Sequence, residues 1–465
     1  MTETPAVGGG VGSLDGRRVG VVGGGLAGIS AAIALAEAGA TVTLFEARPR
    51  LGGATHSFRR EGLTVDNGQH VFLRCYTAYR GLLDRLGVAD LAPLQRRFDI
   101  PVVMPAGRRA SLRRSNLPAP LHLARSLAAY APLAPADRVT AFRTALALGR
   151  LDPDDPALDH ESFGAWLARR GVRPGAVRGL WDLLITAALN TRASDASAAL
   201  SAMVIQRALL CGRDAADIGV PAVPLSELHA EPAARLLVRL GVEVRTKAKV
   251  RSVRPLGGRF VLDVEGDHVD TDACVLAVPH RQAAPLLPEE AAREGVRFAA
   301  LGASPIVNVH VIYDRRITSL PFAAAVDSPA QWLFDRTRIA GVDAGQYLAV
   351  SVSAAGRYID APTSELRGTF LAALEDMFPA AHGAEVRSFF VTRERRATFR
   401  QAPGSRALRP PAETRLPGLL IAGAWTDTGW PDTMEGAVRS GLQAARLARE
   451  HLFRVGGIRA AGAVA

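Results

Sequence analysis

One short segment near the N-terminus constrains the fold of this chain more than any other feature. Residues 18–23 read as a buried β-strand, and the glycine-rich turn Gly23-x-Gly25-x-x-Gly28 and a helix of small residues follow it. Thr41–Glu46 then forms a second strand, so the unit is a βαβ crossover. Its glycines let a pyrophosphate approach the helix N-terminus, and the Glu46 carboxylate can accept hydrogen bonds from both ribose hydroxyls. This unit predicts a dinucleotide-binding domain, and Glu46 would repel a 2′-phosphate.

A second element follows directly after the Glu46 strand. In Arg48-Pro-Arg-Leu-Gly-Gly53, an arginine offers positive charge to a diphosphate, and two glycines let the backbone pass close beneath a flat ring system. The alternative is an exposed turn after a strand. The position of this element just beyond the ribose-binding strand favours the binding role over the exposed turn.

Two later segments have the same strand, turn and helix character. They are 225–300, and 419–423 with the helix that begins near Thr433. We therefore expect an α/β fold with α+β inserts, in which a Rossmann-type domain is assembled from separated segments and interleaved with a mixed helix/sheet substrate domain. The expected boundaries are a tail at 1–16, the dinucleotide-binding domain at 17–94, 225–303 and 412–455, the substrate domain at 95–224 and 304–411, and a tail at 456–465. Within the inserts we expect one long helix over 121–150.

Composition excludes several classes of protein. Hydrophobic residues make up 48% and charged residues 22%, which excludes general disorder. The net charge is +11, but the arginines are scattered, so we expect no nucleic-acid partner. The ten histidines show no metal-ligand spacing, and no apolar run reaches the roughly 18 residues of a membrane span. The first residues lack a secretory signal, which predicts a cytoplasmic protein.

The motifs together resemble the FAD-dependent amine oxidase and carotenoid-desaturase superfamily. Gly23–Gly28, Glu46, the Arg-x-Gly-Gly element and the later Gly423…Met434-Glu-Gly-Ala437 element carry this resemblance. Within the superfamily, the stretches LFEARPRLGGATHSF, VDNGQHVFLRCY and GAWTDTGWPDTMEGAVRSG are most similar to the hydroxysqualene dehydroxylase family of bacterial hopanoid pathways. These motifs lie at the two ends of the chain, and the region between them matches only in its order of elements.

The resemblance implies that the cofactor is FAD. It places Val250 beside the adenine and the 434–437 helix start at the flavin pyrimidine edge, where a helix N-terminus stabilises negative charge on reduction. One position departs from the family pattern, because the residue after Gly423 is usually acidic and here is Ala424, for which Asp427 is the candidate substitute. The expected FAD-binding residues are Gly23, Gly25, Leu26, Ala27, Gly28, Glu46, Ala47, Arg48, Arg50, Gly52, Gly53, Val250, Ala277, Gly423, Asp427, Thr433, Met434 and Ala437.

The turn Asp66-Asn-Gly-Gln-His70 carries an acid, an amide and an imidazole within five residues. One interpretation is a polar turn between two strands, with Asp66 and Asn67 in Asx-turn hydrogen bonds. The resemblance instead places this turn beside the isoalloxazine ring. That placement favours functional roles for Gln69 and His70. We further predict that His70, Gln69 and Asp66 are catalytic, with His70 as the proton donor and Asp66 tuning it.

The resemblance implies reductive removal of the hydroxyl of hydroxysqualene, with hydride from reduced flavin, a long apolar isoprenoid substrate and an electron donor that no motif identifies. A carotenoid or phytoene-type desaturase or isomerase is the alternative. A flavin amine oxidase is disfavoured, because that branch places a lysine near flavin N5 and the only lysines here, Lys247 and Lys249, fall on the adenine side. A non-catalytic FAD-binding scaffold at a membrane is a further alternative.

Such a substrate has to be taken from a bilayer or from another protein. The segment 116–133 places apolar side chains on one broad face, after a cluster of arginines. This pattern fits either a monotopic membrane anchor or an ordinary core helix of the insert. The side chains concerned are Leu117, Leu121, Leu123, Leu127, Tyr130 and Leu133, with Arg108, Arg109, Arg113 and Arg114.

Overall fold

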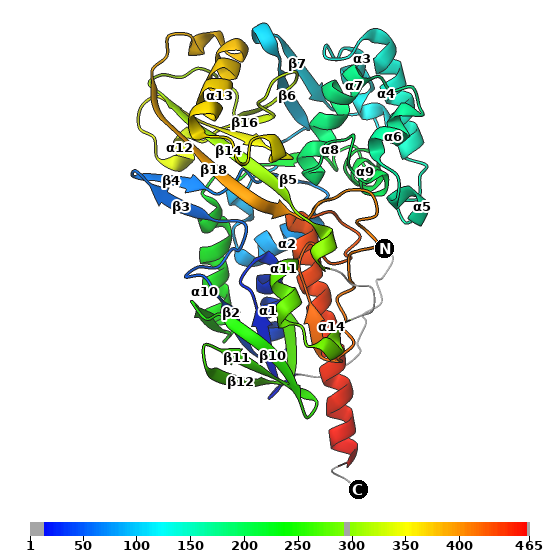
Figure 1. Ribbon diagram of the computed structural model, residues 1–465, viewed down its shortest axis with the longest axis vertical. Coiled ribbons are helices and arrows are strands. Elements are labelled where there is room, and N and C mark those ends of the chain that lie inside the picture. Colours follow the sequence, from blue (N-terminus) through cyan, green and yellow to red (C-terminus); the bar gives the residue numbers. More distant parts are fainter. Residues whose placement is uncertain (1–13, 293–297, 463–465) are drawn as a thin grey trace, which may run out of the picture.

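A five-stranded parallel sheet forms the lower part of the molecule (Figure 1). The computed structural model describes residues 14–292 and 298–462, without the side chains of 456–462. Three separated segments supply the strands, in the order β19-β13-β1-β2-β9. All four pairings are parallel, as the predicted assembly from separated pieces requires. The strands are β1 (Arg18–Val22), β2 (Thr41–Glu46), β9 (Glu243–Thr246), β13 (Ala273–Leu276) and β19 (Leu419–Ile421).

Both faces of this sheet are covered, because its strands are apolar on both sides. One face packs against helices and the other against an antiparallel sheet. The helix face has α1 (Leu26–Glu37), α2 (Thr77–Leu86), α10 (Glu231–Arg239) and α14 (Met434–Gly462). The other face has β10 (Val250–Leu256), β11 (Arg259–Val264) and β12 (Asp267–Thr271), followed by the short α11 (His280–Ala283).

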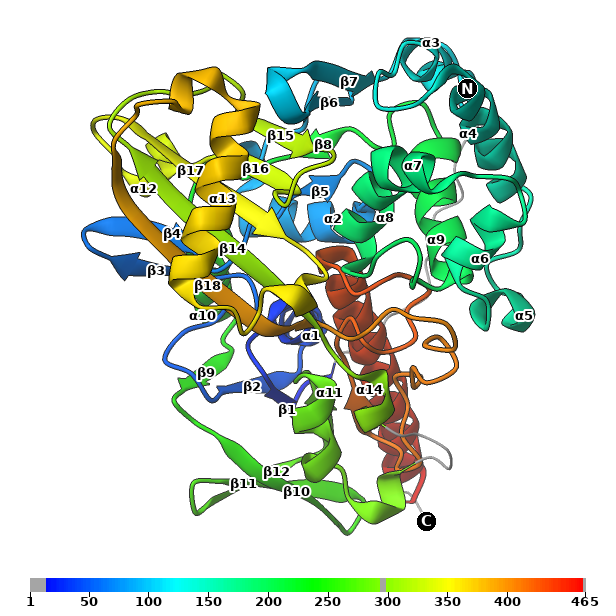
Figure 2. The same ribbon diagram turned by 45° about the horizontal axis from the view of Figure 1, so that its top comes forward.

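A seven-stranded sheet forms the second layer, above the first (Figure 2). Its order is β18-β14-β17-β16-β15-β6-β7, so strands from both inserts share one sheet, and α13 (Thr363–Met377) packs on it. β15 and β6 pair in parallel, and the other pairs are antiparallel. Its strands are β6 (Asp99–Val103), β7 (Arg109–Arg113), β14 (Ser304–Tyr313), β15 (Phe322–Ala325), β16 (Trp332–Asp335), β17 (Gln346–Val352) and β18 (Val386–Thr398), with α12 (Thr337–Ala340) after β16.

A group of helices stands beside the second sheet. The expected single helix over 121–150 is wrong, because a 3-10 turn at 121–123 and α3 end before Pro132, and a new helix begins at Pro135. Proline lacks the N–H that a helix interior needs but suits a first turn. The helices are α3 (Ala124–Ala128), α4 (Pro135–Leu148), α5 (Pro156–Asp159), α6 (Phe163–Ala168), α7 (Pro174–Ala176), α8 (Asp182–Leu189) and α9 (Ala198–Ile205).

The described structure reaches into both of the expected tails. Leu14 is 1% exposed in the core beside α1, and its N–H donates to the carbonyl of Ala38. α14 continues to Gly462, past the expected end of the domain at 455. Residues 1–13 and 463–465 lie outside the described residues, and the other domain boundaries stay predictions.

Candidate active site

The glycine turn after β1 is shaped by close backbone contacts. Gly23 has φ +110°, and a Cβ added to it would lie 2.3 Å from the carbonyl oxygen of Ala277. A Cβ on Gly28 would lie 1.8 Å from the Gly23 oxygen. Gly25 differs, because only the Cα of Gly53, at 3.8 Å, comes within 4 Å of an added Cβ. Gly25 is the N-cap residue of α1 and has no side chain to cap it, so the α1 N-terminus and the Gly53 backbone form a cradle that fits a pyrophosphate.

Glu46 is held at the end of β2 by two backbone donors. The N–H of Gly24 donates to Glu46 Oε2 at 2.7 Å, and the N–H of Arg48 donates to Oε1 at 2.8 Å. Each oxygen keeps a further lone pair, so the carboxylate can still accept ribose hydroxyls. Arg50 Nη1 lies 3.4 Å from the Gly53 oxygen, and burial lowers the pKa of this arginine. A half-buried cation beside the cradle suits a diphosphate.

The segments expected to meet the cofactor converge at the carboxyl ends of the parallel strands. The N–H of Ala248 donates to the carbonyl of Glu46, which brings the start of β10 and Val250 beside β2. Ala277 follows β13 and donates its N–H to Val22. Gly423 follows β19 and donates its N–H to Ser440 Oγ at 2.8 Å. Ligands in open α/β sheets bind at this edge, so the placement agrees with the expected FAD site.

The N-terminus of α14 lies at the same edge. Thr433 Oγ1 accepts from the N–H of Gly436 at 3.2 Å, which fixes the first turn, while Met434 is buried. In the preceding loop, buried Arg409 donates to the carbonyls of Ala424 and Thr426. Asp427, the candidate substitute for the missing acid at 424, is exposed, and its side chain has no hydrogen bond among the described residues. Its contact with a cofactor stays a prediction.

Asp66 is buried at the end of a hairpin formed by β3 (Ser57–Arg60) and β4 (Leu63–Asp66). Its Oδ1 accepts from Ser57 Oγ at 2.6 Å and from the Leu225 N–H at 3.0 Å, and its Oδ2 pairs with Arg336. The carboxylate therefore anchors the 66–70 turn to the start of α12 and to Leu225, in the segment that precedes α10. Asp66 acts on His70 through its charge, not through a hydrogen bond.

Gln69 and His70 lie between β4 and the short strand β5 (Phe72–Leu73), and both are half-buried. The side chain of Gln69 has no hydrogen bond within the described part of the chain, so it is free to meet a ligand. His70 Nδ1 lies 3.2 Å from the carbonyl oxygen of Gly68. Burial lowers the pKa of His70, although the Gly68 carbonyl and the charge of Asp66 oppose this shift. The ring is therefore mainly neutral at pH 7, and its Nε2 lone pair is left for a ligand.

Three charged residues outside the expected set also shape the site. Arg336 is buried and pairs with Asp66, and Asp217 is buried and pairs with Arg74 and Arg114. Each of these ion pairs joins segments that are distant in the sequence. Asp432 precedes α14 and accepts from the Phe399 N–H at 2.9 Å, and burial raises its pKa to about 6. The only sequence signal for Asp432 was its place before a helix start, while the ion-pair partners carry no local signal. Both lysines are exposed between β9 and β10, next to Glu46.

Comparison with known proteins agrees with this geometry. The model of the flavin containing amine oxidoreductase family matches residues 26–448. The chain belongs to this family. As a member of the flavin containing amine oxidoreductases, it is an FAD-dependent oxidoreductase, and the α/β fold, the cofactor and the enzyme class predicted from the sequence are confirmed.

Relatives and solved structures refine the placement within the family. The chain is 31% identical to the hydroxysqualene dehydroxylase of Sinorhizobium fredii over 93% of this chain and 98% of that one. It is 25% identical to the zeta-carotene desaturase of Synechocystis, over 92% and 96% of the two chains. A putrescine oxidase variant shares the fold with a TM-score of 0.69 and 21% identity, over 92% and 98% of the two chains. The predicted resemblance to hydroxysqualene dehydroxylases is thus confirmed.

Proposed function

We propose that the enzyme reductively removes the hydroxyl group of hydroxysqualene and releases squalene and water. The observation that carries this proposal is the 31% identity to a hydroxysqualene dehydroxylase over nearly the full length of both chains. The half-buried turn at Gln69 and His70 supports it, since it lies in the segment where the family resemblance places the flavin ring. The C–O bond breaks, the carbon receives a hydride, and the oxygen leaves with a proton.

When bound, reduced FAD supplies the hydride, and an external electron donor has to restore it. The residues at 69–73 then have three tasks: to hold the hydroxyl, to deliver its proton and to exclude water. Val71 and Leu73 pack against the apolar core of the helical part, which keeps water from a developing allylic cation. Neutral His70 positions the hydroxyl through Nε2, and it donates a proton only in its imidazolium form.

The expected result for His70→Ala is a 100-fold or greater slowing of a single turnover, because positioned proton transfer contributes roughly 10²- to 10⁴-fold. The measurement uses photoreduced enzyme, hydroxysqualene in detergent and product mass. A His70→Ala enzyme with the wild-type rate and an unchanged flavin spectrum would remove His70 from the mechanism. Squalene formation by the wild type tests the function itself.

The pH profile separates two candidate acids. A general acid works in its protonated form, so the rate is full below its pKa and falls as the pH rises through it. If Asp432 is the donor, the rate falls above about pH 6 and this inflection disappears in Asp432→Asn. If His70 is the donor, the fall begins at a lower pH than an ordinary histidine would give, and it persists in Asp432→Asn.

The zeta-carotene desaturase relative supports a second candidate, an oxidation of a long polyene. Such a reaction would use the same FAD site, but the flavin would accept electrons from the substrate instead of supplying them. Incubation of oxidised enzyme with a phytoene-type polyene, and of reduced enzyme with hydroxysqualene, separates the two by product mass. Loss of two hydrogens from the polyene, without dehydroxylation, would favour the desaturase.

We also propose that the rim at 116–121 contacts an anionic membrane from which the substrate enters. None of the helices in residues 14–292 and 298–462 is long and apolar enough to cross a bilayer. Leu117 and Leu121 are 50% and 46% exposed. The expected apolar face is smaller than predicted, since Tyr130 and Leu133 are buried in the core.

The arginines expected to accompany this rim also differ from the expectation. Arg114 is buried in an ion pair with Asp217, so it is unavailable to lipid headgroups. Arg113 pairs with Asp99, and Arg109 lies over the ring of Phe378. Arg108 is exposed, but it precedes β7, whereas the rim at 116–121 follows that strand.

Changing Leu117 and Leu121 together to Ser is expected to weaken binding to anionic vesicles at least about fivefold, because two exposed apolar side chains no longer enter the lipid. Co-sedimentation with phosphatidylglycerol vesicles measures it. The matched control changes Val238 and Leu256, which are 69% and 66% exposed on other elements, to Ser. Equal binding by both double variants, or no binding by the wild type, would contradict the claim.

A further inference from the structure

The side chain of Asn67 joins parts of the molecule that belong to different layers. Asn67 is 5% exposed, and its Oδ1 accepts from the His56 N–H at 3.1 Å. Its Nδ2 donates to the carbonyl of Ala54 at 2.9 Å and to Oε1 of Glu394 at 3.3 Å. Ala54 directly follows Gly53 of the cradle, whereas Glu394 is half-buried on β18 of the second sheet. One amide therefore connects the cofactor cradle with the layer above it.

The backbone of Asn67 is held from the same two sides. Its N–H donates to the carbonyl of His56 at 2.9 Å, and its own carbonyl accepts from Asn308 Nδ2 at 3.2 Å. Asn308 is fully buried on β14, which pairs with β18. From here β18 continues toward the start of α14 (Figure 1). The turn that carries His70 is thus fixed between the two layers of the site.

The groups around the Asn67 side chain match an amide. Ala54 and Glu394 both present acceptor oxygens, so the atom that faces them has to be a donor. The His56 N–H is a donor, so the other atom has to be an acceptor. Aspartate would fit the same space, but one of its oxygens would face a carbonyl and a carboxylate without a proton to share. Buried acceptors that face one another are costly, so this position has a definite chemical requirement.

These contacts differ from the Asx turn that is one interpretation of the sequence. In an Asx turn the side-chain oxygen bonds a backbone N–H two residues further on. The N–H that bonds Asn67 Oδ1 instead belongs to His56, which lies 11 residues away in the sequence. The amide therefore acts between segments and not within its own turn.

We propose that Asn67 is a positioning residue for His70, which fixes the 66–70 turn both to the cofactor cradle and, through Glu394, to the second sheet. This inference rests on the proposed function, because it gives Asn67 a role through His70 and not through contact with the substrate. A loosened turn would displace the imidazole and also release the loop that follows Gly53.

Reversing the hydrogen bond between Asn67 and Glu394 tests the proposal. Asn67→Asp places acceptors against one another beside the cradle loop, and we expect FAD to leave the holoenzyme at least tenfold faster. Adding Glu394→Gln supplies a donor from the other side, so the double variant should recover at least threefold of this loss. Glu394→Gln alone keeps an oxygen that accepts from Asn67 and should change the rate less than threefold. The rise of flavin fluorescence after dilution measures the release.

A second readout follows the imidazole itself. Burial lowers the pKa of His70, so a loosened turn that admits water should let this pKa rise toward the ordinary histidine value. We expect this rise in Asn67→Ala. NMR titration of histidine-labelled holoenzyme measures it, with the signal assigned by its loss from His70→Ala. The charged and titratable groups that interact with His70 are Asp66, Glu394, Arg336, His56 and His229.

Asn190→Asp is the matched control. Asn190 is 3% exposed, and both ends of its amide are hydrogen-bonded, as in Asn67. Its partners are Ser304, Thr398 and Ala354. This variant should melt at a lower temperature than the wild type, because buried hydrogen bonds are lost. It should change neither the release of FAD by more than about twofold nor the pKa of His70.

Two results would overturn the proposal. One is that Glu394→Gln gives no slower release of FAD in the Asn67→Asp background. The other is an unchanged pKa of His70 in Asn67→Ala. Neither measurement uses hydroxysqualene, so a wild type that meets both expectations but forms no squalene would count against the proposed function alone.

Discussion

Replacing Gly25 by valine is expected to lower FAD affinity about 100-fold or more, ~2.7 kcal/mol, while the chain still folds. Gly25 has φ −79° and ψ 179°, an extended conformation that any residue adopts, so valine causes no backbone strain there. An added Cβ would meet only the Cα of Gly53, at 3.8 Å. The new side chain thus projects into the cradle that we assign to the pyrophosphate. Flavin absorbance per protein after purification measures the loss.

The neighbouring glycines give a different expectation. A side chain at Gly23 or Gly28 would clash with backbone oxygens at 2.3 and 1.8 Å, so these substitutions should damage folding itself. The matched control is Gly81→Val in α2, where an added Cβ has no neighbour within 4 Å. Because a bound ligand stabilises the folded state, Gly25→Val should melt at the temperature of FAD-stripped wild type. If Gly25→Val retained a full complement of FAD, the pyrophosphate would not bind in the cradle that we assign to it.

The parallel sheet and its ligand edge were predictable because their signals are local. β1, the glycine turn and Glu46 lie within 29 residues of one another, and each strand is a short apolar run between turn residues. Pro132 was also a local signal, for a helix break. The apolar periodicity on both sides of this proline nevertheless favoured one continuous helix. Strands β15 and β16 have no distinct signal in the sequence, because short apolar runs suit several structures equally well.

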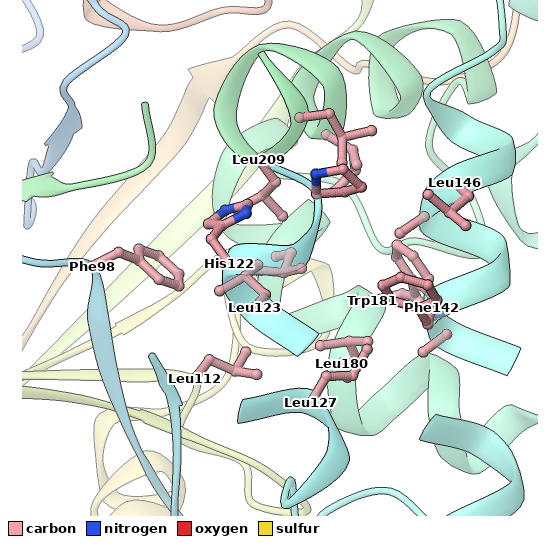
Figure 3. Close-up of a pocket in the computed structure, with 16 residues that line it drawn as sticks. Phe98, Leu112, His122, Leu123, Leu127, Phe142, Leu146, Leu180, Trp181 and Leu209 are labelled. Atoms are coloured by element: carbon pink, nitrogen blue, oxygen red, sulfur yellow. The ribbon is translucent and has the colours of Figure 1, made fainter. Parts of the chain in front are cut away.

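The partners of the site's charged groups could not be predicted from local pattern. Asp66 pairs with Arg336, 270 residues away, and nothing near either residue specifies the other. The same holds for the apolar pocket in the helical part, whose two polar side chains, His122 and Trp181, come from separate elements (Figure 3). Such contacts depend on how the two layers pack, which periodicity does not encode. The catalytic assignments at 66–70 therefore stay predictions, although the anchored geometry of the turn is now visible.

Removal of the Asp217 carboxylate is expected to destabilise the fold by about 3–5 kcal/mol, because it leaves buried Arg114 without its partner. Asp217 is fully buried and accepts from Arg114 Nε at 2.7 Å, from Arg74 Nη2 at 3.0 Å and from the Phe98 N–H at 2.7 Å. It thereby joins the start of the second sheet to the segment that follows β5. Chemical denaturation of Asp217→Ala measures the loss.

Asp214→Ala is the matched control. Asp214 is about half exposed and lies 3.6 Å from the same Arg74, so its removal should cost less than about 1 kcal/mol. Equal stability of Asp217→Ala and Asp214→Ala would show that the buried carboxylate does not hold these segments together.

The same network predicts a loss of stability in acid. Burial alone would raise the pKa of Asp217, but the hydrogen bonds from Arg114 and Arg74 outweigh it and lower that pKa below the ordinary aspartate value. A group with a lowered folded-state pKa contributes its stability above the unfolded pKa, near 3.9, and loses it as the pH falls through the folded value. The wild type should therefore lose unfolding free energy from about pH 5 downward more steeply than Asp217→Asn, which cannot titrate there. Parallel curves for the two proteins between pH 5 and 3 would show that this carboxylate is not the acid-sensitive group.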